Sequence, residues 1–180
     1  MAEVSALAEM RDAAVEILLK GESMLSSLSA SDYSAQSSGA FGSPIGAHFR
    51  HVLDHFQNLL ESYASGLVDY DARRRDPLLE SDPAAALAKS CDFRQLLDRL
   101  DPAETRPLDV LCKVSYSDST PIRVPSNLAR ELMFCVSHAI HHHAMIGMQC
   151  SQRGIELPDQ LGVAPSTVIH RAQATTASGK

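Results

Sequence analysis

The stretch from Asn127 to Cys150 constrains the fold more than any other part of the chain. Its apolar residues recur at helical spacing and occupy nearly every side of the expected helix. A helix that is apolar all round is buried, so this one has to be covered by other elements. Asn127 and the preceding Ser126 are residue types that cap helix N-termini. The chain is therefore expected to fold around a long helix in its C-terminal half.

Three further helices are predicted from apolar spacing and from their start and stop residues. They span the first 28 residues, the stretch from Ser43-Pro44 to Ser65-Gly66, and the stretch from Ser81-Asp82-Pro83 to about Leu100. Alternating apolar residues between Leu108 and Val124 favour a short hairpin. We expect an all-α four-helix bundle with a short β-hairpin or irregular insertion before the last long helix.

The remaining segments are expected to connect these helices. Residues 25–43 are rich in Ser, Ala and Gly, which is typical of a loop, and residues 67–82 form a charged connection. After Gly154 the chain is punctuated by Pro and Gly, and we expect a mobile tail over about 168–180. At 180 residues the chain is expected to form a single domain, 1–180.

Charge and composition exclude several classes of partner. Sixteen basic against 22 acidic residues give a net charge of −6, which argues against a nucleic-acid binder. No apolar run approaches the roughly 20 residues that span a bilayer, and acids occupy the N-terminus where a signal peptide is basic. The four cysteines form no C-x-x-C pair, which indicates free thiols. We expect a cytoplasmic protein without membrane or nucleic-acid partners.

The composition of the chain does not explain how its histidines are distributed. Seven of the eight histidines fall in two short windows, each inside a predicted helix. They are His48, His51 and His55 in the second helix, and His138, His141, His142 and His143 in the fourth.

In the fourth helix, His138 and His142 are four residues apart and project from the same stripe. Two imidazoles on adjacent turns can bind one cation, as in helical H-x-x-x-H zinc sites. His143 points about 140° away at about 100° per residue, and His141 lies on the flank. We expect His141 and His143 to be supporting or surface groups.

Two ligands from one helix do not hold a divalent ion tightly, so a third is expected from a facing helix. The second helix offers three candidates on one flank, which are His48, His51 and His55. Buried imidazoles without partners would leave hydrogen-bonding capacity unused, whereas a metal ion satisfies one nitrogen of each.

Three segments together resemble a known superfamily. They are Pro44-Ile-Gly-Ala-His-Phe-Arg-His-Val-Leu-Asp-His55, Tyr70-Asp-Ala-Arg-Arg-Arg-Asp76 and His138-Ala-Ile-His-His-His-Ala-Met-Ile146. This pattern resembles the DinB/YfiT-like metalloproteins, and the segment Leu161–Thr167 resembles the ending of an uncharacterised branch of that superfamily.

The resemblance implies an up-down-down-up four-helix bundle with a divalent metal bound by three histidines. The fourth-helix pair maps onto His138 and His142. The second-helix ligand usually lies five residues after a glycine and before two apolar residues, which points to His51 with His48 in reserve. The sequence departs from the commoner pattern at His143-Ala-Met145, where Arg-Gly-Gln is usual, so the substrate is not implied.

A site with three histidines leaves a divalent ion an open position for water or substrate. The resemblance implies thiol-dependent transfer or hydrolysis, with a low-molecular-weight thiol and a small-molecule substrate as partners. Zinc is the expected metal, with nickel, iron or manganese as alternatives, because imidazole suits several divalent ions. The alternative is a non-catalytic module in which the metal has a structural or sensor role. A homodimer is expected only by analogy.

Other residues are weaker candidates for roles at this site. Asp54 could accept an imidazole N–H or pair with Arg50, and Glu131 could be a general base or a first-turn helix acid. Cys135 could be a fourth ligand or a small buried group. The three consecutive basic residues could form a solvated loop or bind the carboxylates of a thiol cofactor. These are Arg73, Arg74 and Arg75.

Overall fold

The computed structural model describes residues 5–37 and 42–178, and most of these are helical. The long helices are α1 (Ala6–Ser27), α3 (Ile45–Ser62), α5 (Pro83–Asp98), α6 (Leu128–Gln152) and α7 (Pro165–Ser178). The short helices are α2 (Ala30–Ser34), α4 (Pro77–Ser81) and the 3-10 turn η1 (Tyr63–Ser65). The strands are β1 (Leu67–Asp69), β2 (Leu108–Cys112) and β3 (Ile122–Ser126).

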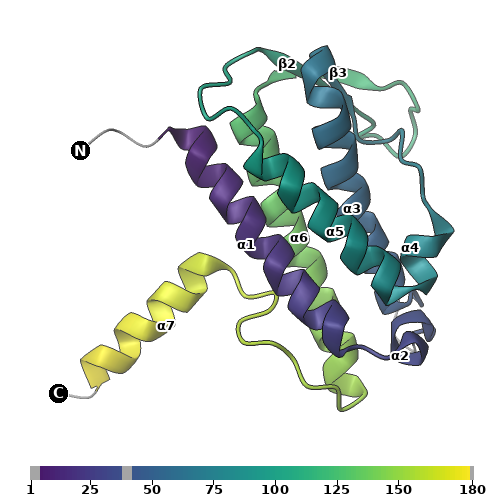
Figure 1. Cartoon of the computed structure of the whole chain (residues 1–180), viewed down its shortest axis with the longest axis vertical. Helices are drawn as coiled ribbons and strands as arrows, with labels where there is room; N and C mark the ends of the chain where they lie inside the picture. Colours follow the sequence, from purple (N-terminus) through teal and green to yellow (C-terminus); the bar gives the residue numbers. More distant parts are fainter. Residues whose placement is uncertain (1–4, 38–41, 179–180) are drawn as a thin grey trace.

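Four of the long helices pack side by side and enclose the core. Helix α1 packs on α5 and α6, and α3 packs on the same two helices from the other side (Figure 1). The residues between them are large and apolar, and the following are almost fully buried: Phe49, Phe56, Phe93, Leu132 and Ile146. The face of α6 that meets α3 is the one that carries the paired histidines.

The helix boundaries follow from capping chemistry. The Asp82 carboxylate accepts a hydrogen bond from the Ala84 N–H at the start of α5, and Asn127 accepts from the Arg130 N–H at the start of α6. Both caps are the residues expected from the sequence. At α3 the cap position is Pro44, whose ring cannot accept a hydrogen bond. The helix therefore starts one residue later than the Ser43-Pro44 pair predicts when Ser43 is taken as the cap and Pro44 as the first helical residue.

The expectation of an all-α chain is corrected by a small sheet. Strand β2 pairs antiparallel with β3, which is the predicted hairpin, and parallel with β1, which the sequence pattern did not predict. Strand β1 is only three residues long and follows Gly66, whose φ of 79° ends η1 in the left-handed region. Three residues are too few to show an alternating pattern.

Short helices also lie within two predicted connections. Helix α2 occupies part of the expected loop over 25–43, of which residues 38–41 lie outside the described part of the chain. Helix α4 interrupts the charged connection over 67–82, with the Asp76 carboxylate accepting a hydrogen bond from the Leu78 N–H.

The C-terminal segment, where a mobile tail was expected over about 168–180, is helical. It forms α7, which extends away from the other long helices (Figure 1). Its mobility stays a prediction. In the described part of the chain, no helix combines the length and hydropathy needed to cross a bilayer.

Candidate metal centre

Histidines from α3 and α6 gather where these two helices pack against each other. The ring of His51 is central, with its centroid 4.6 Å from that of His55, 4.8 Å from that of His138 and 4.6 Å from that of His142. The centroids of His138 and His142 are 4.5 Å apart. The three histidines expected as ligands, His51, His138 and His142, are therefore neighbours in the folded protein.

A fourth imidazole, that of His55, also lies at this centre. His51, His55 and His138 each offer one ring nitrogen within 4.8 Å of the others, the spacing of groups that can share one ion. His51 and His55 are four residues apart, so α3 carries the same H-x-x-x-H spacing as α6. That repeated spacing is the sequence signal that favours His55 over His48.

His48 lies to one side of this centre. Its Nδ1 is 3.0 Å from Nδ1 of His142, and it is buried. One of the two nitrogens donates and the other accepts. His48 therefore contacts the cluster through His142.

Two hydrogen-bonding features show that the donor set fits a metal ion. The Nδ1 of His55 lies 2.8 Å from the His51 carbonyl oxygen. Because a carbonyl only accepts, this Nδ1 carries the proton and leaves the Nε2 lone pair of His55 available as a ligand. The Nε2 of His138 is buried and has no hydrogen-bond partner among the described residues. A ligating imidazole presents such a nitrogen before the ion is bound. His143 Nδ1 is also buried without a partner in the described part of the chain, so at His138 this feature favours a metal ion only together with the neighbouring imidazoles.

Burial keeps these imidazoles in the form that binds metal. Desolvation, together with the neighbouring imidazoles, lowers the pKa of His51 to about 2, that of His138 to about 4 and that of His142 to about 3. Burial also lowers the pKa of His55. A metal ligand has to be unprotonated, so at neutral pH these rings do not need to lose a proton first.

Aromatic side chains fix the ring planes on the side of the cluster near the sheet. Phe134 stacks on His138 with centroids 5.6 Å apart, and Tyr70 stacks on His55 at 5.4 Å. Imidazole rings whose orientation is already fixed by packing lose less side-chain entropy when they bind an ion.

The two candidate catalytic carboxylates are both held by other partners. Asp54 is buried and accepts from Arg50 Nη1 at 3.1 Å, which is the ion pair expected as the alternative to an imidazole contact. Glu131 is fully buried in the first turn of α6 and accepts hydrogen bonds from Tyr70 Oη, Ser126 Oγ and Arg130 Nη1. This geometry gives Glu131 a structural role.

Cys135 lies in the core, one turn before His138 on α6. Its Sγ is 3.8 Å from the Tyr70 hydroxyl, and burial raises its thiol pKa to about 12. It does not belong to the group of residues that can share an ion. Its place in the structure is that of a small buried group.

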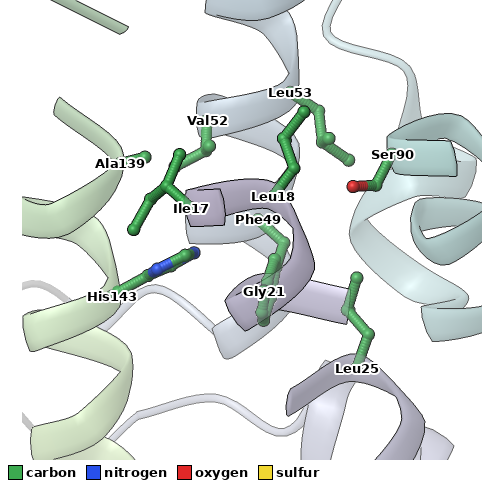
Figure 2. Close-up of a pocket in the computed structure, with 10 residues that line it drawn as sticks. All are labelled: Ile17, Leu18, Gly21, Leu25, Phe49, Val52, Leu53, Ser90, Ala139 and His143. Carbon is green, nitrogen blue, oxygen red and sulfur yellow. The ribbon is translucent and has the colours of Figure 1, made fainter. Parts of the chain in front are cut away.

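The two remaining histidines of the fourth-helix window point elsewhere. His141 is exposed, with its ring 5.3 Å from that of His142. His143 points between α1 and α3, where it lines a cavity of about 10 Å³ with apolar side chains such as Ile17 and Val52 (Figure 2). A cavity of that size holds no more than a single water, so it is not a substrate pocket.

The three consecutive arginines have three different environments. Arg73 is half-buried and donates from Nη1 to Nδ1 of His51. Arg74 is exposed and pairs with Glu61 at 2.7 Å. Arg75 is exposed, with a φ of 53°. Only Arg73 of the three is in contact with the histidine cluster.

Comparison with known proteins gives one distant relative. The chain is 32% identical over 105 residues to FK506-binding protein 5 of Rhizopus delemar. The aligned segment covers 58% of this chain and 27% of the fungal protein. No family model matches the chain. No solved structure matches it either.

Proposed function

We propose that this chain is a DinB/YfiT-like metalloprotein that binds one divalent ion between α3 and α6. His51 and His138 are two ligands, and the third is His55 or His142. The observation that carries the proposal is the convergence of these imidazoles around His51, with the buried Nε2 of His138 lacking a partner among the described residues. The mutual packing of α1, α3, α5 and α6 supports the four-helix bundle of that superfamily.

The proposed activity is metal-dependent transfer to or from a low-molecular-weight thiol, or hydrolysis, on a small-molecule substrate. A divalent ion held by three neutral imidazoles keeps a net charge near +2 and an open position, and it can activate a bound water or thiol. Zinc is the first choice of metal, with nickel, iron or manganese as alternatives. The stacked rings of Tyr70 and Phe134 hold His55 and His138 in orientation.

Zinc binding by untagged protein tests the metal site. Competition with a chromophoric chelator should give one zinc per chain for the wild type. His51→Ala and His138→Ala should each weaken binding by more than the roughly 10- to 100-fold that loss of a supporting residue costs. His55→Ala and His142→Ala compare the two candidates for the third ligand. The variant that loses more zinc affinity identifies that ligand.

His170→Ala is the matched control, because His170 is exposed on α7. It should bind zinc as the wild type does. Wild-type affinity in both His51→Ala and His138→Ala would refute the proposed site.

A structural or sensor role is the second candidate, and one observation favours it. The rings of His55 and His142 both lie beside the shared pair, so a movement of His142 towards the group formed by His51, His55 and His138 would bring four imidazoles to one ion. Four protein ligands would close the coordination sphere, as in structural zinc sites. Stripped and zinc-loaded protein should therefore be compared in thiol-conjugation and in ester and amide hydrolysis assays. Turnover that appears only with zinc supports the enzyme, and its absence across all assays supports the structural role.

A further inference from the structure

We propose that Arg73 is an anion-binding residue of this centre, and that it selects ligands carrying a carboxylate. This inference rests on the proposed metal site and names the class of molecule that the site takes.

The environment of Arg73 differs from that of the paired arginines near it. Arg50 bonds to both Asp54 and Glu80, and Arg74 pairs with Glu61. Arg73 has no carboxylate within ion-pair distance in the described ranges, and its recorded hydrogen-bond partner is an imidazole. Its Nε is buried and lacks a hydrogen-bond partner in the described ranges.

An incompletely paired guanidinium at a half-buried position is costly for folding. Arginine carries five N–H donors and no acceptor, and burial without an opposite charge leaves its desolvation uncompensated. The carboxylates of Asp54 and Asp71 attract Arg73 only from beyond ion-pair distance, and that of Asp54 is engaged by Arg50. A bound anion would supply the missing partner, and the planar fork of a guanidinium matches the two oxygens of a carboxylate.

Metal binding and the present contact of Arg73 exclude each other at His51. The guanidinium only donates, so its contact uses the lone pair of His51 Nδ1 and leaves the ring proton on Nε2. A neutral imidazole that ligates through Nε2 carries its proton on Nδ1, where Arg73 then finds no acceptor. Ligation through Nδ1 displaces Arg73 directly. In either case an ion at His51 frees the guanidinium of Arg73 at the edge of the centre.

The charge around the centre also favours an anion. The candidate ligands are all neutral imidazoles, so an ion there keeps its charge, and Arg73 adds a positive charge beside it. Of the carboxylates that act on His55, Asp54 is paired with Arg50, which leaves Asp71 as the acidic group that opposes this charge. The chain as a whole carries a net charge of −6, so this is a local feature. A carboxylate bound at the open position of the ion would meet Arg73 as its second partner.

The test uses cobalt(II) as the metal and acetate as the probe. The visible absorption of the cobalt-loaded protein is followed during titration with acetate at constant ionic strength, with acetamide as the uncharged comparison. Acetate should change the spectrum of the wild type to saturation, and acetamide should not. Arg73→Gln should weaken the apparent acetate affinity by roughly 10- to 100-fold, which corresponds to the free energy of hydrogen bonds to a charged group. Arg73→Lys should weaken it by less.

Arg74→Gln is the matched control, because it removes a neighbouring arginine that pairs with Glu61. It should bind acetate as the wild type does. Cobalt affinity is measured separately, and Arg73→Gln should bind cobalt at least as tightly as the wild type, because it removes a competitor for His51.

The outcomes separate this inference from the proposed function. Equal acetate affinity in the wild type and Arg73→Gln, with one cobalt bound by each, overturns the role of Arg73 and leaves the metal site standing. Loss of cobalt binding in a folded Arg73→Gln variant makes Arg73 a support for the site and also overturns the inference. Failure of the wild type to bind cobalt overturns the metal site itself, and the inference with it.

Discussion

Glu131 shows how a buried charge is accommodated beside the histidine centre. Its carboxylate is fully buried, and it accepts from the Tyr70 hydroxyl at 2.9 Å, from Ser126 Oγ at 2.5 Å and from Arg130 Nη1 at 2.8 Å. Its position in the first turn of α6 adds a favourable interaction with the helix dipole. Through Tyr70, which stacks on His55, this network also supports the proposed metal centre.

Replacement of Glu131 by Ala should destabilise the protein. The buried Tyr70 hydroxyl would lose its carboxylate acceptor, and a buried donor left without a partner costs about 1–3 kcal/mol. Urea denaturation measures the free energy of unfolding. Glu16→Ala is the control, since Glu16 is exposed and its 3.8 Å pair with Lys20 should contribute little. Equal stability of the two variants would contradict the role given to Glu131.

The four thiols should fall into two classes of reactivity. Cys135 and Cys150 are buried, and burial raises their pKa values to about 12 and about 11. At pH 8 roughly one Cys150 thiol in a thousand is then the reactive thiolate, and fewer still at Cys135. Cys91 and Cys112 are only half-buried.

Native protein at pH 8 should therefore react with Ellman's reagent at no more than two thiols per chain, and protein in guanidinium at all four. The reaction is followed by absorbance. Fast modification of three or four thiols in the native state would show that Cys135 or Cys150 is accessible, against the packing described.

At the scale of the elements, α3 is held in place by a close approach to α4. A Cβ added at Gly46 would lie 1.9 Å from the backbone oxygen of Glu80 and 2.7 Å from Cε1 of Tyr33. Glycine is required here because backbone cannot move aside as a flexible side chain does. Gly46 lies five residues before His51, so this contact also helps to set the position of the histidine cluster.

Gly46→Ala should therefore destabilise the protein by about 1–3 kcal/mol or more, the usual cost of overpacking. Gly147→Ala in α6 is the control, because the nearest atom to its added Cβ, Leu157 Cδ1, is 3.6 Å away. It should be neutral or stabilising by roughly 0.5–1 kcal/mol, since Ala is the better helix former. Thermal unfolding measures the stability of both variants. A Gly46→Ala variant as stable as Gly147→Ala would disprove the close approach of α3 to α4.

The four long helices that enclose the core were predictable from sequence, because apolar spacing and caps such as Asp82 and Asn127 define them. The short elements β1, α2 and α4 were missed because three to five residues are too few to show a period. Helix α7 was missed for a different reason. Its Thr, Ala and Ser residues form no apolar face, and its two largest apolar residues, Val168 and Ile169, are only half-buried or exposed.

The site was predictable in its residue types and in the spacing of His138 and His142. The H-x-x-x-H spacing of His51 and His55 was available as a signal for that pair, but which α3 histidines face α6 depends on how α3 is rotated against α6. That rotation brings His55 to the centre and leaves His48 against His142. The contact of Arg73 with His51 depends on the path of an irregular loop and could not be predicted.

At the scale of the whole molecule, one side of α6 packs into the apolar core and another side carries the candidate metal ligands. One side carries His143 towards α1 and a nearly filled apolar space (Figure 2). The other carries His138 and His142 towards α3. Helices α1 and α5 complete the core, so the position of the proposed metal centre depends on how all four long helices pack.

The most direct test of the metal centre is an anomalous difference map from crystals of untagged, zinc-loaded protein, collected at the zinc absorption edge. We predict one peak per chain, within about 2.0–2.1 Å of a ring nitrogen of His51, of His138 and of either His55 or His142. A peak elsewhere in the molecule, or no peak between α3 and α6, would contradict it.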